Sequence, residues 1–453
     1  MKKLPFLIWG LLLSFFSTAI AQELDTIRYN QYGVAVDRKE LRSEARNNIL
    51  VFESKHQNYK FWFDNRVQVD AATFFGAKSD YDKIGNGASI RRARFAVKAQ
   101  VTKDWYGEVD VDFADGIFEL KDAIVEYDGI KNVALKVGNF KEDFSMEQTT
   151  SSRYLTFMER PMVCKALVPS RHLGIQGEYL RDHFRASLGM FLQRVAGVEE
   201  VTNVQDNNKD YGRNQGYSIT SKVGWMPYTE DRMQGCYLGV KGSYRTPKTD
   251  VAPKDYGGAR FSTRNSTSIN RKKYLDTDVI PNVDHEWLRG VEAAAYYGGF
   301  RVQGEWIGNH VTTEATYYNF TGWYVQAAYL LFGGKQKFNV SEGEFTQPTR
   351  GKEWGDLELA MRCDYLSLND KDVYGGSGAN FTTGLNFYVN NNVKIALNYQ
   401  YTNNDRYANG RGKLFIGHDA TGAPTTDYKK AVEGKGKGGV SYHMLAMRFE
   451  INF

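Results

Sequence analysis

Cysteine, proline and long apolar runs are scarce in this 453-residue sequence. Its three cysteines, Cys164, Cys236 and Cys363, are odd in number and have no metal-ligand spacing. They give no support for a disulfide framework or a zinc site, and we expect no cofactor. Only nine prolines occur, and no Pro/Ser linker or abrupt change of composition divides the chain. The sequence therefore indicates a single main domain.

Net charge is also small. The chain carries +5 at pH 7, of which Lys2 and Lys3 supply two charges. This balance does not favour nucleic-acid binding. No Gly-x-Ser-x-Gly nucleophile motif accompanies the seven histidines, so the sequence does not favour an enzyme either.

The first 21 residues have the form of a signal peptide. Lys2 and Lys3 precede an apolar run from Leu4 to Phe16, and the small-residue site Ala19-Ile20-Ala21 follows. We predict a signal peptide at residues 1–21, a polar N-terminal extension without period-two pattern at 22–58, and the main domain at 59–453. No later stretch is apolar enough for a transmembrane helix, so membrane insertion would require a β-barrel.

Apolar and polar residues alternate along most of the main domain. Between Tyr59 and Phe75, one face carries apolar side chains such as Val67, and the other carries polar ones such as Asp70. A membrane barrel requires this pattern, because one face meets lipid and the other meets water. The sequence therefore predicts an all-β fold, a sixteen-stranded antiparallel transmembrane β-barrel. Its strands begin near Lys60, Ser89, Trp105, Leu120, Val133, Arg171, His183, Gly216, Gln234, Glu286, Phe300, Thr321, Gly355, Phe381, Val393 and Tyr442.

The connections between these strands alternate in length. Those after even-numbered strands are mostly tight, as at residues 102–104 and 298–299, and are expected to face the periplasm. Those after odd-numbered strands are often long, and are expected to face outward or to fold into the barrel: residues 139–170, 194–215, 246–285 and 402–441. Residues 332–354 break the rule, because this long connection falls on the periplasmic side. Either it is a structured excursion or the counted register slips there.

The last strand has apolar side chains at every second position and ends on the aromatic Phe453. A terminal strand of this form is what barrel-assembly machinery recognises. An ordinary edge strand at the chain end is the weaker interpretation.

Several motifs resemble the phosphate-selective porin O and P family of outer-membrane barrels. Residues 90–95, Ile-Arg-Arg-Ala-Arg-Phe, resemble the arginine-rich second strand of that family, and residues 144–160 resemble its long third loop. Residues 322–329, 354–360 and 384–388 agree in the same order. The resemblance implies an integral barrel of the bacterial outer membrane, a homotrimer, an in-folded third loop, and a path that passes small anions such as phosphate.

Basic side chains on the water-facing side are the candidates for this path, because Arg and Lys can replace the hydration that an anion loses in a narrow passage. On strands and in the expected third loop they are Arg66, Arg92, Arg94, Lys98, Lys136, Lys141, Arg153, Arg160 and Lys165. Neighbouring acids such as Glu108, Asp110 and Asp122 offer the alternative that these cations are paired. Pairing would weaken the selectivity.

Basic residues also crowd two of the expected outer loops: Arg260, Arg264, Arg271, Lys272 and Lys273, then Lys429, Lys430, Lys435 and Lys437. They either concentrate anions at the mouth of a pore or contact anionic lipopolysaccharide.

Three alternative functions remain open from the sequence. A general-diffusion porin of weak selectivity would use the same barrel. An outer-membrane barrel enzyme would need a nucleophile and a histidine at the rim, and His443 falls on the lipid-facing side. An adhesion barrel would bind ligands through its loops without conducting ions.

Overall fold

The computed structural model describes residues 28–36, 40–46, 48–77, 82–192, 194–195, 215–247, 255–264, 266–433 and 439–453. The predicted signal peptide lies outside the described residues, as do Lys435 and Lys437. The chain forms two compact units, Met1–Arg42 and Ser43–Phe453. The described part of the first unit contains a short antiparallel hairpin of β1 (Arg28–Tyr29) and β2 (Ala35–Val36).

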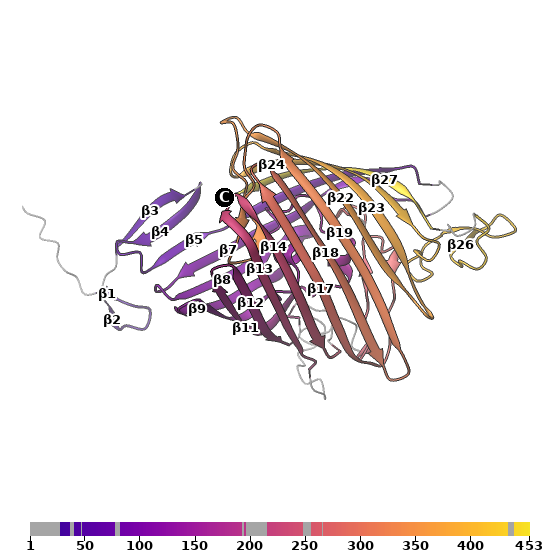
Figure 1. Ribbon diagram of the computed structural model, residues 1–453, viewed down its shortest axis with the longest axis horizontal. Coiled ribbons are helices and arrows are strands. Elements are labelled where there is room, and N and C mark those ends of the chain that lie inside the picture. The colour runs from indigo at the N-terminus through magenta and orange to yellow at the C-terminus, as the bar shows by residue number, and fades with distance from the viewer. Residues whose placement is uncertain are drawn as a thin grey trace, which may run out of the picture. The chain divides into compact units, whose positions relative to one another are not determined.

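Sixteen antiparallel strands of the second unit close into a barrel, as the alternating pattern predicted (Figure 1). Each strand pairs with the next, and the last pairs with the first. The strands are β6 (Arg66–Phe75), β7 (Gly87–Gln100), β8 (Trp105–Asp112), β9 (Glu119–Ile130), β10 (Val133–Lys141), β11 (Arg171–Arg181), β12 (Phe184–Phe191), β13 (Ser218–Asp231), β14 (Gln234–Arg245), β17 (Val283–Tyr297), β18 (Phe300–Thr313), β19 (Tyr317–Leu330), β22 (Asp356–Asp370), β23 (Val373–Tyr388), β24 (Val393–Asn404) and β27 (Tyr442–Asn452).

Alternate residues of these strands face inward and outward. On β7, Arg92 and Ala96 are buried inside the barrel, whereas Phe95 on the opposite face is 43% exposed. The same alternation on β27 buries Arg448 and exposes Phe449. The outer surface therefore presents apolar side chains, and the inner wall is largely polar.

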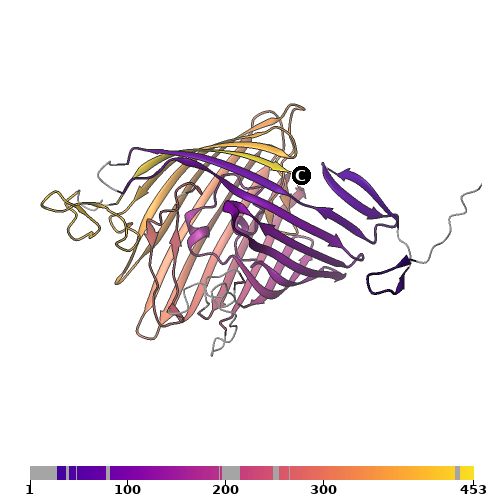
Figure 2. The same ribbon diagram turned by 180° about the vertical axis from the view of Figure 1, so that it is seen from behind.

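Tight turns close one end of the barrel, which we call the turn end. The chain reverses there through residues 131–132, 182–183 and 298–299. Asn132, Asp182 and Gly298 have φ angles of 64°, 50° and 54°, the left-handed backbone that two-residue hairpins need. The other end, which we call the loop end, carries the long connections 142–170, 246–282 and 405–441; the last, drawn in yellow, extends beyond the strands in Figure 2. It includes the pair of β25 (Gly417–His418) and β26 (Pro424–Thr425).

The long connection between β19 and β22 lies at the turn end, so the counted register has not slipped. It contains a hairpin of β20 (Phe338–Asn339) and β21 (Glu344–Phe345). Both phenylalanines are buried against Tyr237 and Tyr296, which project inward from β14 and β17. The excursion is structured and enters the barrel.

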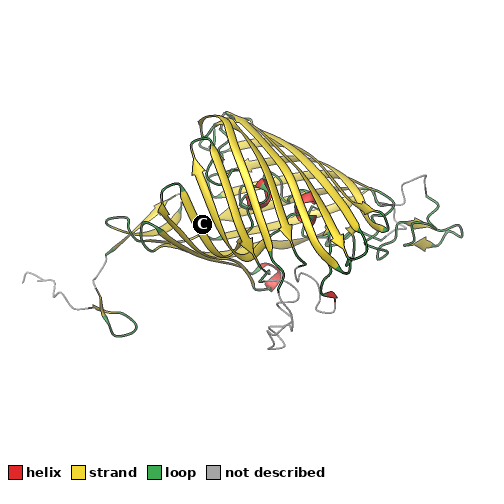
Figure 3. Cartoon of the chain, turned by 60° about the horizontal axis from the view of Figure 1, so that its bottom comes forward, coloured by secondary structure: helices red, strands yellow, loops and turns green. Residues whose placement is uncertain are grey.

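Residues 142–170, between β10 and β11, pack against the inner face of the barrel. They include the short helices α2 (Met146–Thr149) and α3 (Met162–Ala166), drawn in red within the ring of strands in Figure 3. Phe144 and Val163 share a buried apolar cluster with Ile307 of β18 and Phe320 of β19. These strands therefore carry apolar residues on both faces where the loop covers them. In the described part of the chain, no helix is long and apolar enough to cross a membrane.

The connection 246–282 also contributes to this cluster. Phe261 and Leu275 are buried in it. Phe261 precedes β15 (Ser262–Thr263), and Leu275 belongs to β16 (Leu275–Asp276), which pairs with β15. A 3-10 turn, η1 (Ala114–Gly116), follows β8. The main hydrophobic core thus lies inside the barrel, between the loops and the wall.

The structure also contains strands that the sequence pattern did not predict. β3 (Leu41–Arg46) and β4 (Ile49–Ser54) lie in the expected extension. The strand predicted to begin near Lys60 is divided into β5 (Lys60–Phe63), which pairs with β4 and β7, and the barrel strand β6, which begins at Arg66. β3 and β4 are only six residues long, and β4 begins with four apolar residues, Ile49–Phe52, that do not alternate with polar ones. β23 begins at Val373, earlier than the predicted start near Phe381. The first residues of this strand are rich in glycine, so few side chains there could reveal an alternating pattern.

Candidate functional site

Hydrogen bonds from the inner wall fix residues 142–170, which we call the inner loop. Asn386 donates to the carbonyl oxygen of Thr156 over 2.8 Å, and Arg448 donates to that of Met158 over 2.8 Å. Arg362 donates to Glu159 O over 2.8 Å. These donors lie on β23, β27 and β22, whereas the loop leaves the wall at β10. The inner loop therefore contacts the opposite side of the barrel.

Buried charges hold the first part of the inner loop. The backbone N–H of Met146 donates to Glu292 over 3.0 Å, and the Ser145 hydroxyl donates to Glu305 over 3.0 Å. Lys241 lies 2.7 Å from Glu292 and also pairs with Glu305. Since buried polar groups are expensive to leave unpaired, this network specifies the position of the loop.

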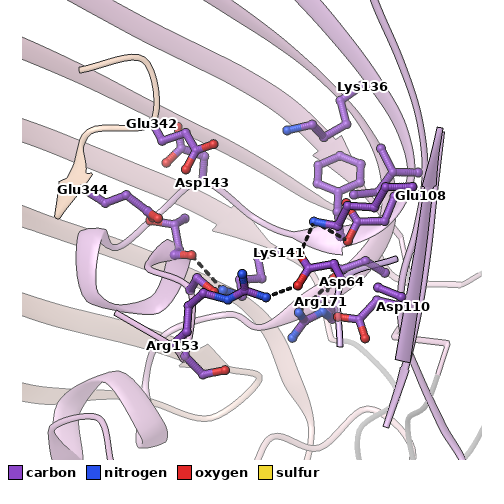
Figure 4. Close-up of a pocket in the computed structure, with 18 of the residues that line it drawn as sticks. Asp64, Glu108, Asp110, Lys136, Lys141, Asp143, Arg153, Arg171, Glu342 and Glu344 are labelled. Carbon is purple, nitrogen blue, oxygen red and sulfur yellow. Dashed lines mark hydrogen bonds and ion pairs between the residues drawn. The ribbon is translucent and has the colours of Figure 1, made fainter. Parts of the chain in front are cut away.

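Three cavities lie beside the inner loop. The central cavity, of about 360 Å³, lies between the wall of β6–β11 and loop residues 151–154 (Figure 4). The outer cavity, of about 550 Å³, lies toward the loop end and reaches Asp115 and Arg271. The turn-side cavity, of about 530 Å³, lies toward the turn end and reaches Arg350. Arg153 lines both the central and the turn-side cavity.

Charged side chains dominate the central cavity, and the two signs are balanced. Its eight basic residues are Arg66, Arg94, Lys98, Lys136, Lys141, Arg153, Arg171 and Arg185. Its eight acidic residues are Asp64, Glu108, Asp110, Asp122, Asp143, Glu178, Glu342 and Glu344.

Most of these charges form ion pairs. Arg94 Nη1 lies 3.0 Å from Asp110, and Lys98 Nζ lies 3.0 Å from Asp64. Arg94 also lies 3.5 Å from Asp112, which lines the outer cavity. This ion-paired layer therefore separates the central cavity from the outer one.

Lys141 and Arg66 differ from the other cations of the central cavity. Among the described residues, neither lies within 4.0 Å of a carboxylate oxygen. Lys141 Nζ donates to the carbonyl oxygens of Thr149 and Thr150 over 2.7 and 3.3 Å. Arg66 Nε donates to Asn452 over 3.1 Å. Carbonyl, amide and hydroxyl oxygens, rather than carboxylates, therefore hold these two side chains.

The outer and turn-side cavities carry an excess of basic residues. Seven basic residues line the outer cavity, against four acids, Asp112, Asp115, Glu119 and Glu159. Four basic residues, Arg153, Lys337, Arg350 and Lys352, line the turn-side cavity against Glu353. The cavities at both ends therefore differ in charge from the balanced one between them.

Glu159 of the inner loop links two basic residues of the outer cavity. It pairs with Arg91, and Lys165 Nζ lies 3.1 Å away. Burial raises the pKa of Glu159, but Arg91 and Lys165 overcome that effect and hold the pKa well below its usual range. The same burial lowers the pKa of Lys165, which Glu159 opposes.

The structure brings together most of the basic residues predicted from the sequence. Seven of the nine line a cavity: Arg66, Arg94, Lys98, Lys136, Lys141 and Arg153 in the central one, and Lys165 in the outer one. Arg92 and Arg160 line none of the three. Arg92 is buried and donates to Gln68 over 2.6 Å.

Arg160 contacts the inner loop itself. It donates to the carbonyl oxygens of Glu147, Gln148 and Thr150 over 2.7, 3.2 and 2.6 Å. Burial lowers the pKa of this guanidinium. These contacts give Arg160 a role in shaping the loop.

Sequence reasoning missed basic residues at two β-bulges. Gln68 pairs with Arg92 and Val69 with Ile90, so Arg91 is an extra residue on β7. Lys121 is extra on β9 in the same way. A bulge changes which side chains face inward, and both residues line the outer cavity. The adjacent charges at 91–92 and 121–122 interrupt strict alternation and are the signal that marks them.

A closed sixteen-stranded barrel with an apolar outer face and a charged interior defines the protein as an outer-membrane porin, an integral barrel of that membrane. The model of the phosphate-selective porin O and P family matches residues 61–421, so the chain belongs to that family. Its family and fold are those of a channel.

Two relatives share sequence with the chain. An uncharacterized protein of Caulobacter vibrioides is 26% identical over 342 residues, which cover 74% of this chain and 66% of that protein, just under two thirds of its length. Porin O of Pseudomonas aeruginosa is 24% identical over 396 residues, which cover 79% of this chain and 86% of that protein.

Solved structures share the fold at low sequence identity. The anion-selective porin from Comamonas acidovorans aligns with a TM-score of 0.51 and 9% identity, covering 87% of this chain and all of that one. The outer-membrane channel DcaP of Acinetobacter baumannii aligns with a TM-score of 0.50 and 11% identity, covering 89% and 99%. These likenesses show the barrel architecture.

Proposed function

We propose that this protein is a passive channel for small anions, with phosphate among its solutes. The observation that carries the proposal is the excess of basic side chains in both end cavities, seven against four and four against one. An excess of positive charge at a narrow mouth attracts anions and raises their local concentration. The N–H groups of Arg and Lys then replace water that an anion loses on entry.

In this proposal, solutes pass between the inner loop and the wall of β6–β11. The path leads from the outer cavity through the ion-paired layer at Arg94 into the central cavity, and leaves through the turn-side cavity past Arg153. The inner loop narrows the lumen, and its anchors on three strands of the opposite wall keep it in place.

Phosphate suits this path because the planar fork of arginine binds phosphate with two hydrogen bonds. Arg66 lines the central cavity without an ion pair in the described part of the chain, whereas Arg94 and Arg171 line it with their guanidinium groups on Asp110 and Asp122. The family name agrees with this choice.

A general-diffusion porin of weak selectivity is the second candidate. The balance of eight basic and eight acidic residues in the central cavity favours it. Opposite charges that are already paired attract a passing anion less than unpaired cations do.

The resemblance to the porin family also underlies proposals about processing and assembly. Residues 1–21 are removed as a signal peptide, and residues 22–58 form a periplasmic extension. The assembly machinery recognises the strand ending at Phe453, the chain forms a homotrimer, and basic outer loops contact lipopolysaccharide.

Planar-bilayer recording of the purified protein tests the proposed function. In a KCl gradient, we expect a reversal potential that indicates preference for chloride over potassium. Added phosphate should reduce the chloride current more than the same ionic strength of gluconate does. A preference for potassium would overturn the anion channel, and equal effects of phosphate and gluconate would leave the general-diffusion porin.

A further inference from the structure

The hairpin of β20 and β21 brings two carboxylates into the central cavity from the turn end. Its anchors are Phe338 and Phe345, which pack against wall residues and against Met146 of the inner loop. Arg185 of β12 donates to the carbonyl oxygen of Ser341 over 2.7 Å and fixes the hairpin tip. The next residues at this tip are Glu342 and then, after Gly343, Glu344.

Glu342 and Glu344 both line the central cavity. Figure 4 shows them on the side opposite Lys136 and Glu108 of the wall. Glu344 is only 4% exposed, and its carboxyl group accepts a hydrogen bond from the backbone N–H of Ser151 in the inner loop. Two segments that enter the barrel from opposite ends therefore meet here.

These two residues decide the charge of the central cavity. Without them its lining would hold eight basic and six acidic residues; with both ionised, the signs balance. Lys141 interacts electrostatically with Glu344. Since water is limited in such a cavity, a carboxylate near Lys141 reduces the attraction of that ammonium for an anion.

We propose that Glu342 and Glu344 are specificity-determining residues that weaken the binding of anions in the central cavity. Conduction requires a site attractive enough for an ion to enter and weak enough for it to leave. A multivalent anion such as phosphate would otherwise dwell beside Lys141 and block the pore. The inference deepens the proposed anion channel and rests on it.

The test compares the double variant E342Q/E344Q with the wild type in planar bilayers at pH 9, where the Glu344 carboxyl group is charged. Two readouts are measured: the chloride-to-potassium permeability ratio, and the phosphate concentration that halves the chloride current. Loss of two negative charges should raise the ratio about twofold or more and lower the half-blocking concentration about tenfold. The matched control D284N/E314Q removes two exposed acids outside the three cavities and should change neither readout.

Two further variants separate a charge effect from a folding effect. E342D/E344D retains both charges and should behave as the wild type does. E344Q alone should shift both readouts in the direction of the double variant. Folding of E342Q/E344Q is checked by the heat-dependent shift of the barrel in gel electrophoresis. If the folded variant has the permeability ratio and half-blocking phosphate concentration of the wild type, or if D284N/E314Q shifts both equally, the role of these acids is refuted.

The same measurements distinguish failure of the proposed anion channel from failure of the role of Glu342 and Glu344. A wild type that prefers potassium, but whose permeability ratio still moves toward chloride in E342Q/E344Q, refutes the proposed function while supporting the role of the two acids. An anion-preferring wild type that is insensitive to both substitutions refutes the role of the acids alone.

Discussion

The ammonium group of Lys141 is held by backbone oxygens, and this sets it apart from its neighbours. Lys98 and Lys136 lie beside carboxylates, whereas Lys141 donates to two carbonyl groups that carry no net charge. Its position at the start of the inner loop is fixed, and it lines the central cavity. Lys141 is thus the strongest single candidate for contact with a passing anion.

We expect K141Q to raise the half-blocking concentration of phosphate about tenfold, because a hydrogen bond from a charged donor contributes about 1.5–3 kcal/mol and 1.4 kcal/mol is tenfold. The measurement is the block of the chloride current by phosphate. K141R keeps the charge and should retain most of the block, while K429Q in an exposed outer loop should have a smaller effect. Equal effects of K141Q and K429Q would locate selectivity at the mouth.

The barrel strands were predictable because the side chains on one face of each strand point toward lipid and those on the other face point into the barrel. The alternation that this requires located all sixteen strands, and it placed the connection 331–355 at the turn end. What lies inside the barrel was harder to predict. Ile307 and Phe320 face inward against the inner loop, and loop packing of this kind leaves no periodic signal.

The candidate site was predictable to a similar degree. Parity of the strands identified Arg94, Lys98 and Lys136, since period two alone decides whether a residue faces inward. It failed at Arg91, where a bulge adds one residue, and at Glu344, which reaches the cavity from an irregular connection. Whether a charge is paired depends on contacts between strands distant in sequence, as between Asp64 and Arg153.

The carboxyl group of Glu344, in the β20–β21 hairpin, leads us to expect that selectivity depends on pH. Burial first, and then Glu342, raise the pKa of Glu344 to about 8, while Lys141 opposes the shift. At pH 6 this carboxyl group is neutral, and at pH 9 it is charged, so the cavity gains negative charge as pH rises. The chloride-to-potassium permeability ratio of the wild type should therefore fall between pH 6 and pH 9.

Reversal potentials measured at both pH values check this expectation, with E344Q as the comparison. Glutamine does not titrate, so E344Q should lose most of the fall. An identical fall in E344Q and the wild type would assign the pH dependence to another group.

At the scale of the whole molecule, barrel closure and the narrow path depend on the same contacts. β27 closes the barrel by pairing with β6, and Arg448 of β27 makes a two-pronged ion pair with Asp70 of β6 over 2.7 and 2.8 Å. The same guanidinium donates to Met158 of the inner loop. One buried side chain therefore joins the first strand, the last strand and the loop.

We expect R448M to destabilise the barrel strongly, because Asp70 is completely buried and would lose its partner. Breaking a buried pair in this way costs about 3–5 kcal/mol. The free energy of unfolding can be measured by urea denaturation in lipid, followed by tryptophan fluorescence. The double variant D70N/R448M removes the orphaned charge and should recover part of the loss, whereas R181A, which removes an exposed arginine, should leave stability unchanged. If R448M and D70N/R448M both unfold as the wild type does, the ion pair does not secure the closure, and the inner loop must be held by its other anchors on β22 and β23.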